Sequence, residues 1–519
     1  MDRNKMIDLL RNGKVETWDV LVIGGGATGL GTALESVTRG YRTVLVERHD
    51  FAKATSSRST KLIHGGVRYL QQGDIGLVFE ALHERGLLRL NAPHLVHNQA
   101  FIIPNYDWWD GPFYTIGLKV YDTMAGRFGL GPSVHITKEE TMKAIPNLKE
   151  EGLRGGVIYY DGQFDDARLA VNLAQTVADY GGIISNYMKV TSLIKNDEKL
   201  VSGAHIVDME TGENHALLAR SVINCTGVFA DDILQMDDPS VPKSIVPSQG
   251  VHLILDREFL QGDFAIMIPK TSDGRVLFAV PWYDKVIVGT TDTLVDEATL
   301  EPKALDEEIK FILDTAAQYL TKKPSREDVK SIFAGLRPLA ASGQGKSTKE
   351  ISRGHRIIVS LSGLITTVGG KWTTYRKMGE ETIDKAVLVA GLPERDSVTK
   401  SLPIHGADND PVIPDTLQHY GTDRHLIREL INDQPALAEK LHPDFNFIAA
   451  EVVWAVRSEM ARTVEDVLAR RVRALFLDAK ASIAMAPVVA QLMAKELDKD
   501  EAWKENQIAE FEKLAQCYI

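Results

Sequence analysis

Three glycines near the start of the chain have the spacing of a dinucleotide-binding turn. Gly24, Gly26 and Gly29 form a G-x-G-x-x-G pattern between an apolar run at residues 18–23 and a helix-forming run at residues 27–39. Such glycines let the backbone approach a pyrophosphate, and the N-terminus of the following helix supplies partial positive charge. A second apolar run ends at Glu47, whose carboxylate can accept hydrogen bonds from a ribose diol. This stretch predicts a dinucleotide site, with NAD and FAD equally admissible.

Residues 54–70, ATSSRSTKLIHGGVRYL, are small, polar and basic. Hydroxyl groups come from Ser56, Ser57, Ser59 and Thr60, cations from Arg58, Lys61 and Arg68, and the run His64, Gly65 and Gly66 permits close approach of the backbone to a planar ligand. A surface loop would have a similar composition. Because the segment follows a nucleotide-binding unit, we favour a loop that contacts a flavin.

Two later segments could add contacts to the same ligand. The run at residues 219–231 predicts a strand that ends in Thr226 and Gly227, and Gly369, Gly370 and Lys371 precede a helix that should begin near Trp372. Cys225 could be a catalytic thiol, but a small cysteine at a strand end is more often inert packing, which we favour.

Composition restricts the class of protein. The 519 residues carry a formal net charge of −12, so the chain is not a general nucleic-acid binder, and an anionic substrate must be captured by a local cluster of Arg and Lys. Its two cysteines exclude a disulfide framework and a Cys-based metal site, which favours a reducing, cytoplasmic compartment. No secretory signal or apolar run long enough to span a bilayer is apparent, and peripheral membrane attachment stays open.

The hydrophobic pattern predicts an α/β protein with three units. A Rossmann-like, parallel FAD-binding domain (residues 1–88, 158–232 and 335–400) carries an inserted antiparallel-sheet substrate domain (89–157 and 233–334), and an all-helical domain follows (401–519). Aromatic side chains crowd residues 107–127, where core packing is favoured over a surface that touches lipid. The arginines at 457, 462, 470, 471 and 473 are expected to be solvated or paired with nearby acids.

With these motifs in view, the chain resembles the FAD-dependent glycerol-3-phosphate dehydrogenases, a flavoprotein family of bacteria and mitochondria. The resemblance covers nearly the whole length: GGGATGLG with Glu47, TSSRSTKLIHGGVRYL, FDDARL, NCTG, GTTD, GLRPL, GGKWTTYR and AVRSEMARTVEDVLARR. It implies bound FAD, oxidation of sn-glycerol 3-phosphate to dihydroxyacetone phosphate by hydride transfer from C2 to flavin N5, and electron delivery to a quinone. It also implies a peripheral position on the inner face of the cell membrane. Whether the chain forms a homodimer is left open.

The resemblance also implies roles for single residues. By analogy with the family's substrate arginines, Arg337 and Arg353 should bind the phosphate, which suits the bidentate guanidinium. His252 is expected to be the general base, Lys371 to stabilise charge on the reduced flavin, and Arg68 and Tyr69 to orient the substrate. The expected cofactor contacts are Gly24, Gly26, Thr28, Gly29, Glu47, Thr55, Ser56, Ser57, Ser59, His64, Gly65, Gly66, Val190, Thr226, Gly227, Gly370, Lys371, Trp372 and Thr373.

Three alternatives accompany this interpretation. A glycerol-3-phosphate oxidase that uses oxygen is disfavoured, because the related oxidases carry an extra surface insertion for which this length leaves little room. An FAD-dependent amine or hydroxy-acid oxidase would use paired arginines on a carboxylate instead. A flavin-binding scaffold would hold FAD that no small phosphate ester reduces.

Overall fold

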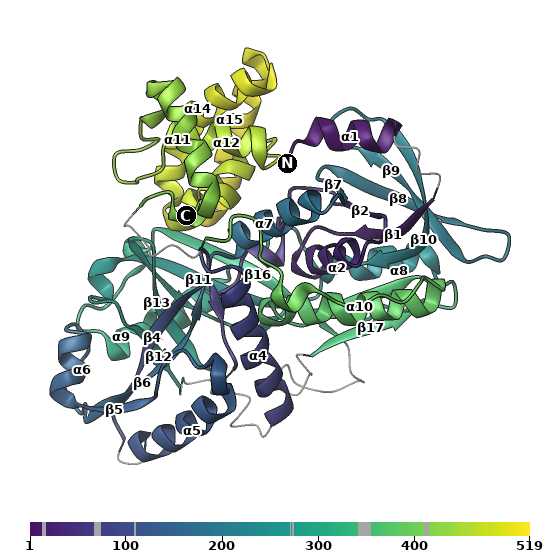
Figure 1. Ribbon diagram of the computed structural model, residues 1–519. Coiled ribbons are helices and arrows are strands. Elements are labelled where there is room, and N and C mark those ends of the chain that lie inside the picture. Colours follow the sequence, from purple (N-terminus) through teal and green to yellow (C-terminus); the bar gives the residue numbers. More distant parts are fainter. Residues whose placement is uncertain are drawn as a thin grey trace.

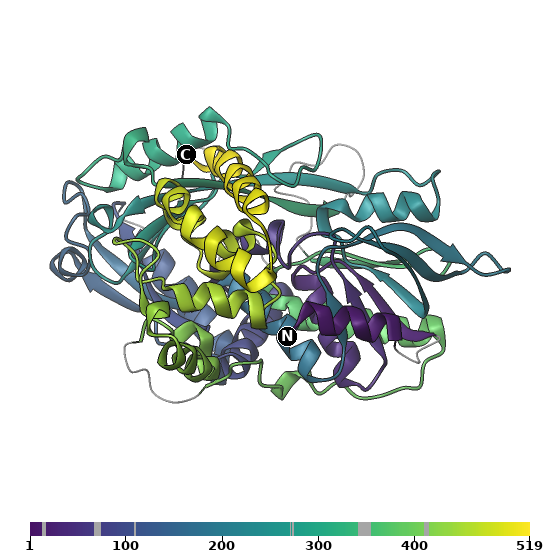
Figure 2. The ribbon, with the colours of Figure 1, turned by 90° about the horizontal axis from the view of Figure 1, so that it is seen from above.

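The computed structural model describes residues 1–12, 17–66, 74–107, 110–269, 271, 274–340, 354–408 and 415–519. They form two β-sheets with packed helices and a helical C-terminal part that lies over the junction between the sheets (Figure 1, Figure 2). The predicted fold class, a Rossmann-like domain with an antiparallel-sheet domain and a C-terminal helical domain, is confirmed.

The first sheet is the nucleotide-binding one. Its strands run in the order β17 (His355–Val359), β18 (Ile365–Gly369), β10 (Asn214–Asn224), β1 (Trp18–Ile23), β2 (Thr43–Val46) and β7 (Ile183–Ser185). From β18 to β7 the pairs are parallel, whereas β17 is antiparallel to β18. Both faces of β1 are covered, which is why residues 18–23 are almost continuously apolar. Strands β8 (Met188–Lys195) and β9 (Val201–Asp208) extend β10 as an antiparallel ribbon.

Three helices pack together against this sheet: α2 (Ala27–Thr38), α7 (Asp166–Asp179) and α10 (Tyr375–Ala390). The tight contact between α2 and α10 depends on small residues, because a Cβ at Gly379 would lie 2.5 Å from the carbonyl oxygen of Gly31. On the other face, helix α1 (Arg3–Asn12) and helix α8 (Ala230–Asp237) contribute to a second apolar cluster that contains Leu21 and Val44. The strand-turn-helix unit predicted from the glycine pattern is therefore the centre of this domain.

The second sheet is mixed and mostly antiparallel. It runs β15 (Thr293–Leu294), β11 (Ile245–Asp256), β14 (Lys285–Gly289), β13 (Leu277–Trp282), β12 (Ala265–Ile268), β4 (His97–Asn105), β6 (Gly155–Gln163) and β3 (Leu62–Ile63), with β16 (Ser331–Ala340) also on β11 and β5 (Val134–Thr137) on β6. Helix α9 (Asp306–Tyr319) buries Ile309 and Ile312 against one face. Helix α6 (Lys138–Ala144) packs on β5 and β6.

The second sheet includes strands that the sequence boundaries assign to the FAD-binding domain. These are β3, residues 158–163 of β6 and residues 335–340 of β16. We propose the same three-unit division with these strands moved to the substrate domain.

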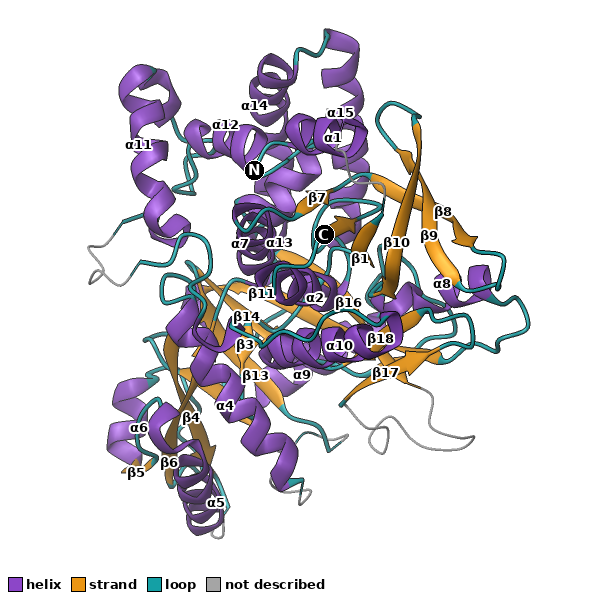
Figure 3. Cartoon of the chain, turned by 45° about the vertical axis from the view of Figure 1, so that its right-hand side comes forward, coloured by secondary structure: helices purple, strands orange, loops and turns teal. Residues whose placement is uncertain are grey.

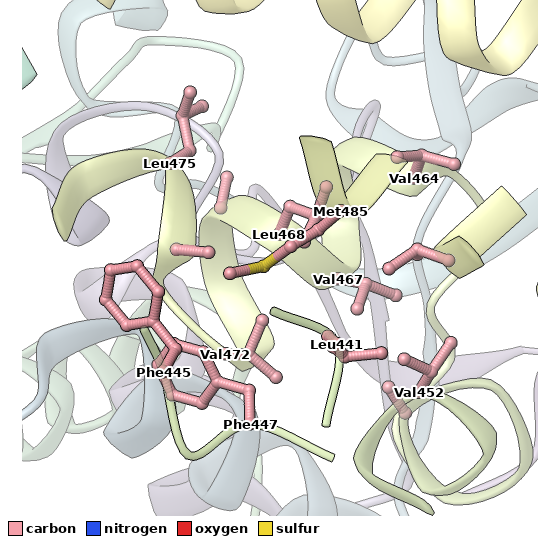
Figure 4. Close-up of a cluster of buried hydrophobic side chains, with 14 of the residues drawn as sticks. Leu441, Phe445, Phe447, Val452, Val464, Val467, Leu468, Val472, Leu475 and Met485 are labelled. Atoms are coloured by element: carbon pink, nitrogen blue, oxygen red, sulfur yellow. The ribbon is translucent and has the colours of Figure 1, made fainter. Parts of the chain in front are cut away.

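The C-terminal part is a bundle of helices with its own core. Its helices are α11 (Arg424–Asp433), α12 (Ala449–Ser458), α13 (Ala474–Leu477), α14 (Ala479–Leu497) and α15 (Glu501–Ala515). Figure 4 shows side chains such as Phe445, Val452 and Met485 in this core. The same apolar cluster continues into Trp282 and Phe333 of the second sheet, so the bundle is packed against the substrate domain.

The C-terminal arginines are paired with acids, one of the two outcomes expected from sequence, but three of the five are buried and also reach acids of the first domain. Arg470, Arg471 and Arg473 are buried and form ion pairs with acids that include Asp50 and Asp166 of the first domain. Those partners lie more than 300 residues away along the chain, so no local sequence pattern indicates them. Arg457 and Arg462 do pair near the surface, with Glu496 and Glu210.

The aromatic segment at residues 107–127 divides between core and surface. Helix α5 (Asp110–Ala125) packs against α4 (Ile75–Asn91) and buries Tyr114 and Tyr121, but it exposes Phe113. Trp108 and Trp109 lie outside the described residues. In the part of the chain that the structure describes, no helix is both long enough and apolar enough to cross a bilayer.

Candidate functional site

A cavity of about 540 Å³ lies where the first sheet meets the second. The residues that line it come from the glycine turn after β1, the segment after β2, strands β8, β11 and β16, and residues 369–373, which lead into α10. The volume lies within the range of about 300–1,000 Å³ that is usual for cofactor and ligand sites. The segments that the sequence singled out are therefore brought to one place by the fold.

The glycine turn is shaped by close backbone contacts. Gly24 has a φ of +109°, and a Cβ there would lie 2.7 Å from the carbonyl oxygen of Cys225. A Cβ at Gly29 would lie 1.9 Å from the carbonyl oxygen of Gly24, so Gly29 serves helix packing and does not line the cavity. The amide of Ala27, the first residue of α2, donates to Ser56 Oγ at 2.9 Å. Gly24, Gly26 and Thr28 line the cavity beside this helix N-terminus, a position that fits a pyrophosphate.

Glu47 lines the cavity one residue after β2, as the motif predicts. Its Oε2 accepts from the Gly25 amide at 2.6 Å and its Oε1 from the His49 amide at 2.8 Å. Burial raises the pKa of this carboxyl, while the two backbone donors act in the opposite direction. These donors fix the carboxylate against the glycine turn, and an ionised carboxylate has further lone pairs for a ribose diol.

The segment after β2 forms one turn of 3₁₀ helix, Thr55–Ser57, at the cavity wall. Thr55 Oγ1 donates to the Leu336 carbonyl at 2.7 Å, and the indole of Trp372 donates to the Ser56 carbonyl at 2.8 Å. The segment is therefore tied to β16, which carries Arg337, and to the start of α10, which is expected at the flavin. The sequence grouped this loop with the turn at Thr226 and Gly227 and with the start of α10, and residues of all three segments line the cavity.

The structure sorts the expected cofactor contacts into two groups. Those that line the cavity are Gly24, Gly26, Thr28, Glu47, Thr55, Ser56, Ser59, His64, Val190, Thr226, Gly227, Gly370, Lys371, Trp372 and Thr373. Gly29, Ser57, Gly65 and Gly66 do not line it. Of these, Gly29, Ser57 and Gly65 have another structural role. Ser57 is buried within the loop, and the Gly65 amide donates to Tyr121 OH at 2.9 Å.

His252 lies on β11 and lines the cavity in a buried position. Its Nε2 is 2.8 Å from Thr60 Oγ1, and its ring stacks on Phe333 with centroids 4.9 Å apart. The facing residue on β14 is Gly289, where a Cβ would lie 2.5 Å from the imidazole. Burial holds the pKa of His252 well below its usual value, with Lys61 and Arg337 adding to the effect. The imidazole is therefore in its neutral form near neutral pH.

Arg337 lies on β16 and reaches the same cavity. Its guanidinium donates to Asp292 Oδ1 at 3.2 Å and to the Thr291 carbonyl at 3.1 Å. A Cβ at Gly250 would lie 2.3 Å from the guanidinium, so Arg337 crosses β11 two residues before His252, where only a glycine leaves room. About a quarter of its side chain stays exposed, which leaves it accessible to a ligand in the cavity.

Lys371 lines the cavity immediately before the 3₁₀ turn Trp372–Thr374 that leads into α10. The two preceding glycines both have a φ of +79°, and a Cβ at Gly370 would lie 2.4 Å from Met378 Sδ. The strained turn explains why glycine is required there. Three further expected substrate contacts, Arg68, Tyr69 and Arg353, lie outside the described residues.

Sequence reasoning missed the residues that support the loop from behind. Asp166, the first residue of α7, is fully buried and binds Ser59 and Lys61. Its motif, FDDARL, marks it only as part of a resemblance, because the partners come from distant segments. Asp232 and Phe229, beside the turn at Thr226, also line the cavity, and nothing in their local sequence distinguishes them.

Comparison with known proteins identifies the family. The model of a family described as FAD dependent oxidoreductase matches residues 19–376, and one described as the C-terminal domain of alpha-glycerophosphate oxidase matches residues 397–504. A probable mitochondrial glycerol-3-phosphate dehydrogenase of Caenorhabditis elegans is 42% identical over 96% of this chain and 74% of its own length. The mitochondrial glycerol-3-phosphate dehydrogenase of Bos taurus is 41% identical over 98% and 74%.

Solved structures extend the likeness to the fold. The glycerol-3-phosphate dehydrogenase from Bacillus halodurans, complexed with FAD, matches with a TM-score of 0.80 and 29% identity over 99% of this chain and 97% of that chain. The L-alpha-glycerophosphate oxidase from Mycoplasma pneumoniae, with FAD bound, has a TM-score of 0.56 at 17% identity over 75% of this chain and 98% of its own, which is a likeness of fold alone.

Proposed function

Since the chain belongs to the family of FAD-dependent glycerol-3-phosphate dehydrogenases, we propose that it oxidises sn-glycerol 3-phosphate to dihydroxyacetone phosphate with FAD as its cofactor. The observation that carries the proposal is one shared cavity, which joins the glycine turn and Glu47 to His252, Arg337 and Lys371. A dinucleotide site alone would need only the first two of these. The additional base and cations fit the oxidation of an anionic alcohol.

The residues that line the cavity fit FAD. The glycine turn at the N-terminus of α2 suits the pyrophosphate, and Glu47 suits the ribose of the ADP half. The Thr55–Ser57 turn and Lys371 would contact the flavin half. The chemistry that bound FAD supplies is acceptance of a hydride at N5 from C2 of the substrate. Lys371 would stabilise negative charge near N1 and the C2 oxygen of the ring.

Arg337 would bind the phosphate of the substrate, and His252 would take the proton of the C2 hydroxyl. A phosphate monoester carries nearly two negative charges at neutral pH, which suits a guanidinium fork. Because loss of a hydride from C2 makes the hydroxyl strongly acidic, a neutral imidazole of low pKa is basic enough to accept its proton. We also propose that Arg68 and Tyr69 orient the substrate and that Arg353 shares the phosphate.

Anaerobic addition of sn-glycerol 3-phosphate to the purified enzyme is expected to bleach the flavin absorbance. This measurement tests cofactor, substrate and electron transfer together. Glycerol, glycine and proline serve as controls, because they lack the phosphate that Arg337 would hold. Bleaching by an amino acid and none by glycerol 3-phosphate would identify an amine oxidase, and bound FAD that none of these compounds reduces would identify a scaffold.

We further propose that the electrons leave to a membrane quinone from an enzyme held at the inner face of the cell membrane by α5. Phe113, Ile116 and Val120 on α5 are about 59%, 67% and 46% exposed, and their spacing places them on one outer face. Helix α4, which packs on α5, also exposes Ile75 and Phe79. Figure 3 shows α5 at the end of the molecule opposite helices α11, α14 and α15, with α4 running from the middle of the molecule towards that end. Such a face suits interfacial attachment without a spanning helix.

A double substitution, Phe113→Gln with Ile116→Gln, is expected to lower binding to phosphatidylglycerol-containing vesicles at least about tenfold, because each large apolar side chain contributes about 1.5–3 kcal/mol when buried. Flotation measures the bound fraction. The matched control is Leu388→Gln with Val389→Gln, since these exposed residues of α10 offer a competing surface. Loss of binding in the α10 variant and none in the α5 variant would reassign the membrane face, and quinone reductase activity should follow the vesicle binding.

A further inference from the structure

Four charged side chains are buried together directly behind the loop that lines the cavity. Lys61 Nζ lies 2.7 Å from Asp166 Oδ2, and a guanidinium nitrogen of Arg473 lies 3.1 Å from Asp166 Oδ1. Asp165 lies 3.7 Å from Arg473 on the other side. The two cations balance the two acids, so the cluster is neutral as a whole, and three of its four side chains are fully shielded from solvent.

This cluster holds the loop by its backbone. Lys61 Nζ and Arg473 both donate to the carbonyl oxygen of Ser57, at 2.7 and 2.9 Å. Asp166 Oδ2 accepts from the amide and the hydroxyl of Ser59, at 3.0 and 2.7 Å. The next residue is Thr60, whose hydroxyl contacts the ring of His252. The support therefore fixes the stretch of loop that carries Ser59 and Thr60 into the cavity.

Arg473 belongs to the C-terminal domain and is the residue just before α13. Its φ of +65° is uncommon for a residue other than glycine, and such conformations concentrate at functional sites. The guanidinium lies 4.5 Å from the ring centroid of Phe476 and 5.5 Å from that of Trp282. The backbone is thus held in an unfavourable conformation while the side chain reaches from one domain into the loop of another.

Arg473 is also the permanent cation of the cluster. Burial lowers the pKa of Lys61 to about 7, although Asp166 acts in the opposite direction. Lys61 can therefore lose its proton near neutral pH, whereas a guanidinium keeps its charge. When Lys61 is neutral, Arg473 is the group that still neutralises Asp166 and still donates to the Ser57 carbonyl.

We propose that Arg473 is a positioning residue for the oxidation, and that the C-terminal helical domain completes the active site by holding the cofactor-contacting loop through it. The proposal rests on the proposed function of the cavity. It gives the C-terminal domain a role beyond packing, since the domain reaches the loop at a backbone carbonyl within three residues of Thr60.

The test compares Arg473→Met and Arg473→Lys with Arg457→Met. Removing the Arg473 charge leaves the Lys61–Asp166 pair intact, and Arg470 and Arg471 still join the two domains through Asp50. Arg457 is the matched control because it is an arginine of the same domain whose partner, Glu496, lies near the surface. FAD content, the visible absorbance spectrum of the flavin, kcat and KM are measured on each purified enzyme.

Arg473→Met is expected to lower kcat per bound flavin about 10- to 100-fold and to shift the flavin absorbance band, with KM for sn-glycerol 3-phosphate changed less than about threefold. Arg473→Lys should recover part of the kcat, because it restores the charge without the fork. Arg457→Met should match the wild type in every measurement.

A wild-type kcat per bound flavin and an unchanged spectrum in Arg473→Met, even with a lower melting temperature, would overturn the proposal and leave Arg473 a purely structural contact. If Arg473→Met does not fold, Arg473→Lys decides, and a kcat equal to the wild type would count against the proposal. The spectrum and FAD content do not depend on substrate. A wild-type flavin that glycerol 3-phosphate fails to bleach would therefore refute the proposed function without obscuring this result.

Discussion

Replacing Arg337 with alanine is expected to raise the KM for sn-glycerol 3-phosphate about 100-fold or more and to change kcat much less. The guanidinium faces the cavity and would make two charge-assisted contacts to the phosphate, each contributing about 1.5–3 kcal/mol. Two contacts at the lower limit sum to about 3 kcal/mol, which corresponds to about a 100-fold change. Because the phosphate is bound equally before and during the oxidation, the loss should appear in KM. Steady-state kinetics with a soluble electron acceptor measure both constants.

Inorganic phosphate provides an independent readout of the same site. As a competitive inhibitor it should bind Arg337→Ala more weakly by a similar factor, whereas an indirect effect on FAD would leave its inhibition constant unchanged. Arg337→Lys should lose only about tenfold, because it keeps the charge but not the fork. A KM within threefold of the wild type in Arg337→Ala would refute the assignment, provided that FAD content is unchanged.

The parts of the site that could be predicted are those encoded by local sequence. The turn at Gly24 and Gly26 requires glycine because the backbone of Cys225 and the loop at Ser56 approach it closely, and this requirement is written into the motif itself. The position of Glu47 could be predicted because it directly follows β2, where the dinucleotide-binding motif has its acidic residue. The roles of His252 and Arg337 came from the resemblance, and the structure adds the reason for their proximity, since Gly250 and Gly289 make room for both side chains.

What could not be predicted depends on contacts between distant segments. A motif gives residue types but not their contacts, so the sequence groups Ser57 and Gly65 with residues that line the cavity, whereas the Ser57 hydroxyl donates to the Ala54 carbonyl and the Gly65 amide to Tyr121 OH. The burial of Arg473 depends on Asp166, 307 residues earlier in the chain. A run of arginines on a helix is usually a solvated face, and only the packing of the bundle on the other domains reveals the exception.

Replacing His252 with glutamine is expected to lower kcat about 100- to 10,000-fold, the range typical for loss of a general base. Glutamine is close in length and can keep the hydrogen bond to Thr60, but it cannot take the proton of the C2 hydroxyl. Binding of the phosphate by Arg337 should persist, so KM and inhibition by inorganic phosphate should change little. The deuterium isotope effect with substrate labelled at C2 should increase, because the oxidation itself becomes the slowest step.

The pH dependence distinguishes a base from a packing residue. The pKa of His252 is lowered by burial and by the charges of Lys61 and Arg337, so the wild type should lose kcat only as the pH falls well below 6.5 and the ring becomes protonated. In Arg337→Ala one of these positive neighbours is gone, the pKa of His252 rises, and the acid limb of the kcat profile should move towards neutral pH. In His252→Gln that limb should vanish. If His252→Gln keeps the acid limb and loses less than tenfold in kcat, the proton must go elsewhere, and His252 is then a packing residue that seats the loop at Thr60.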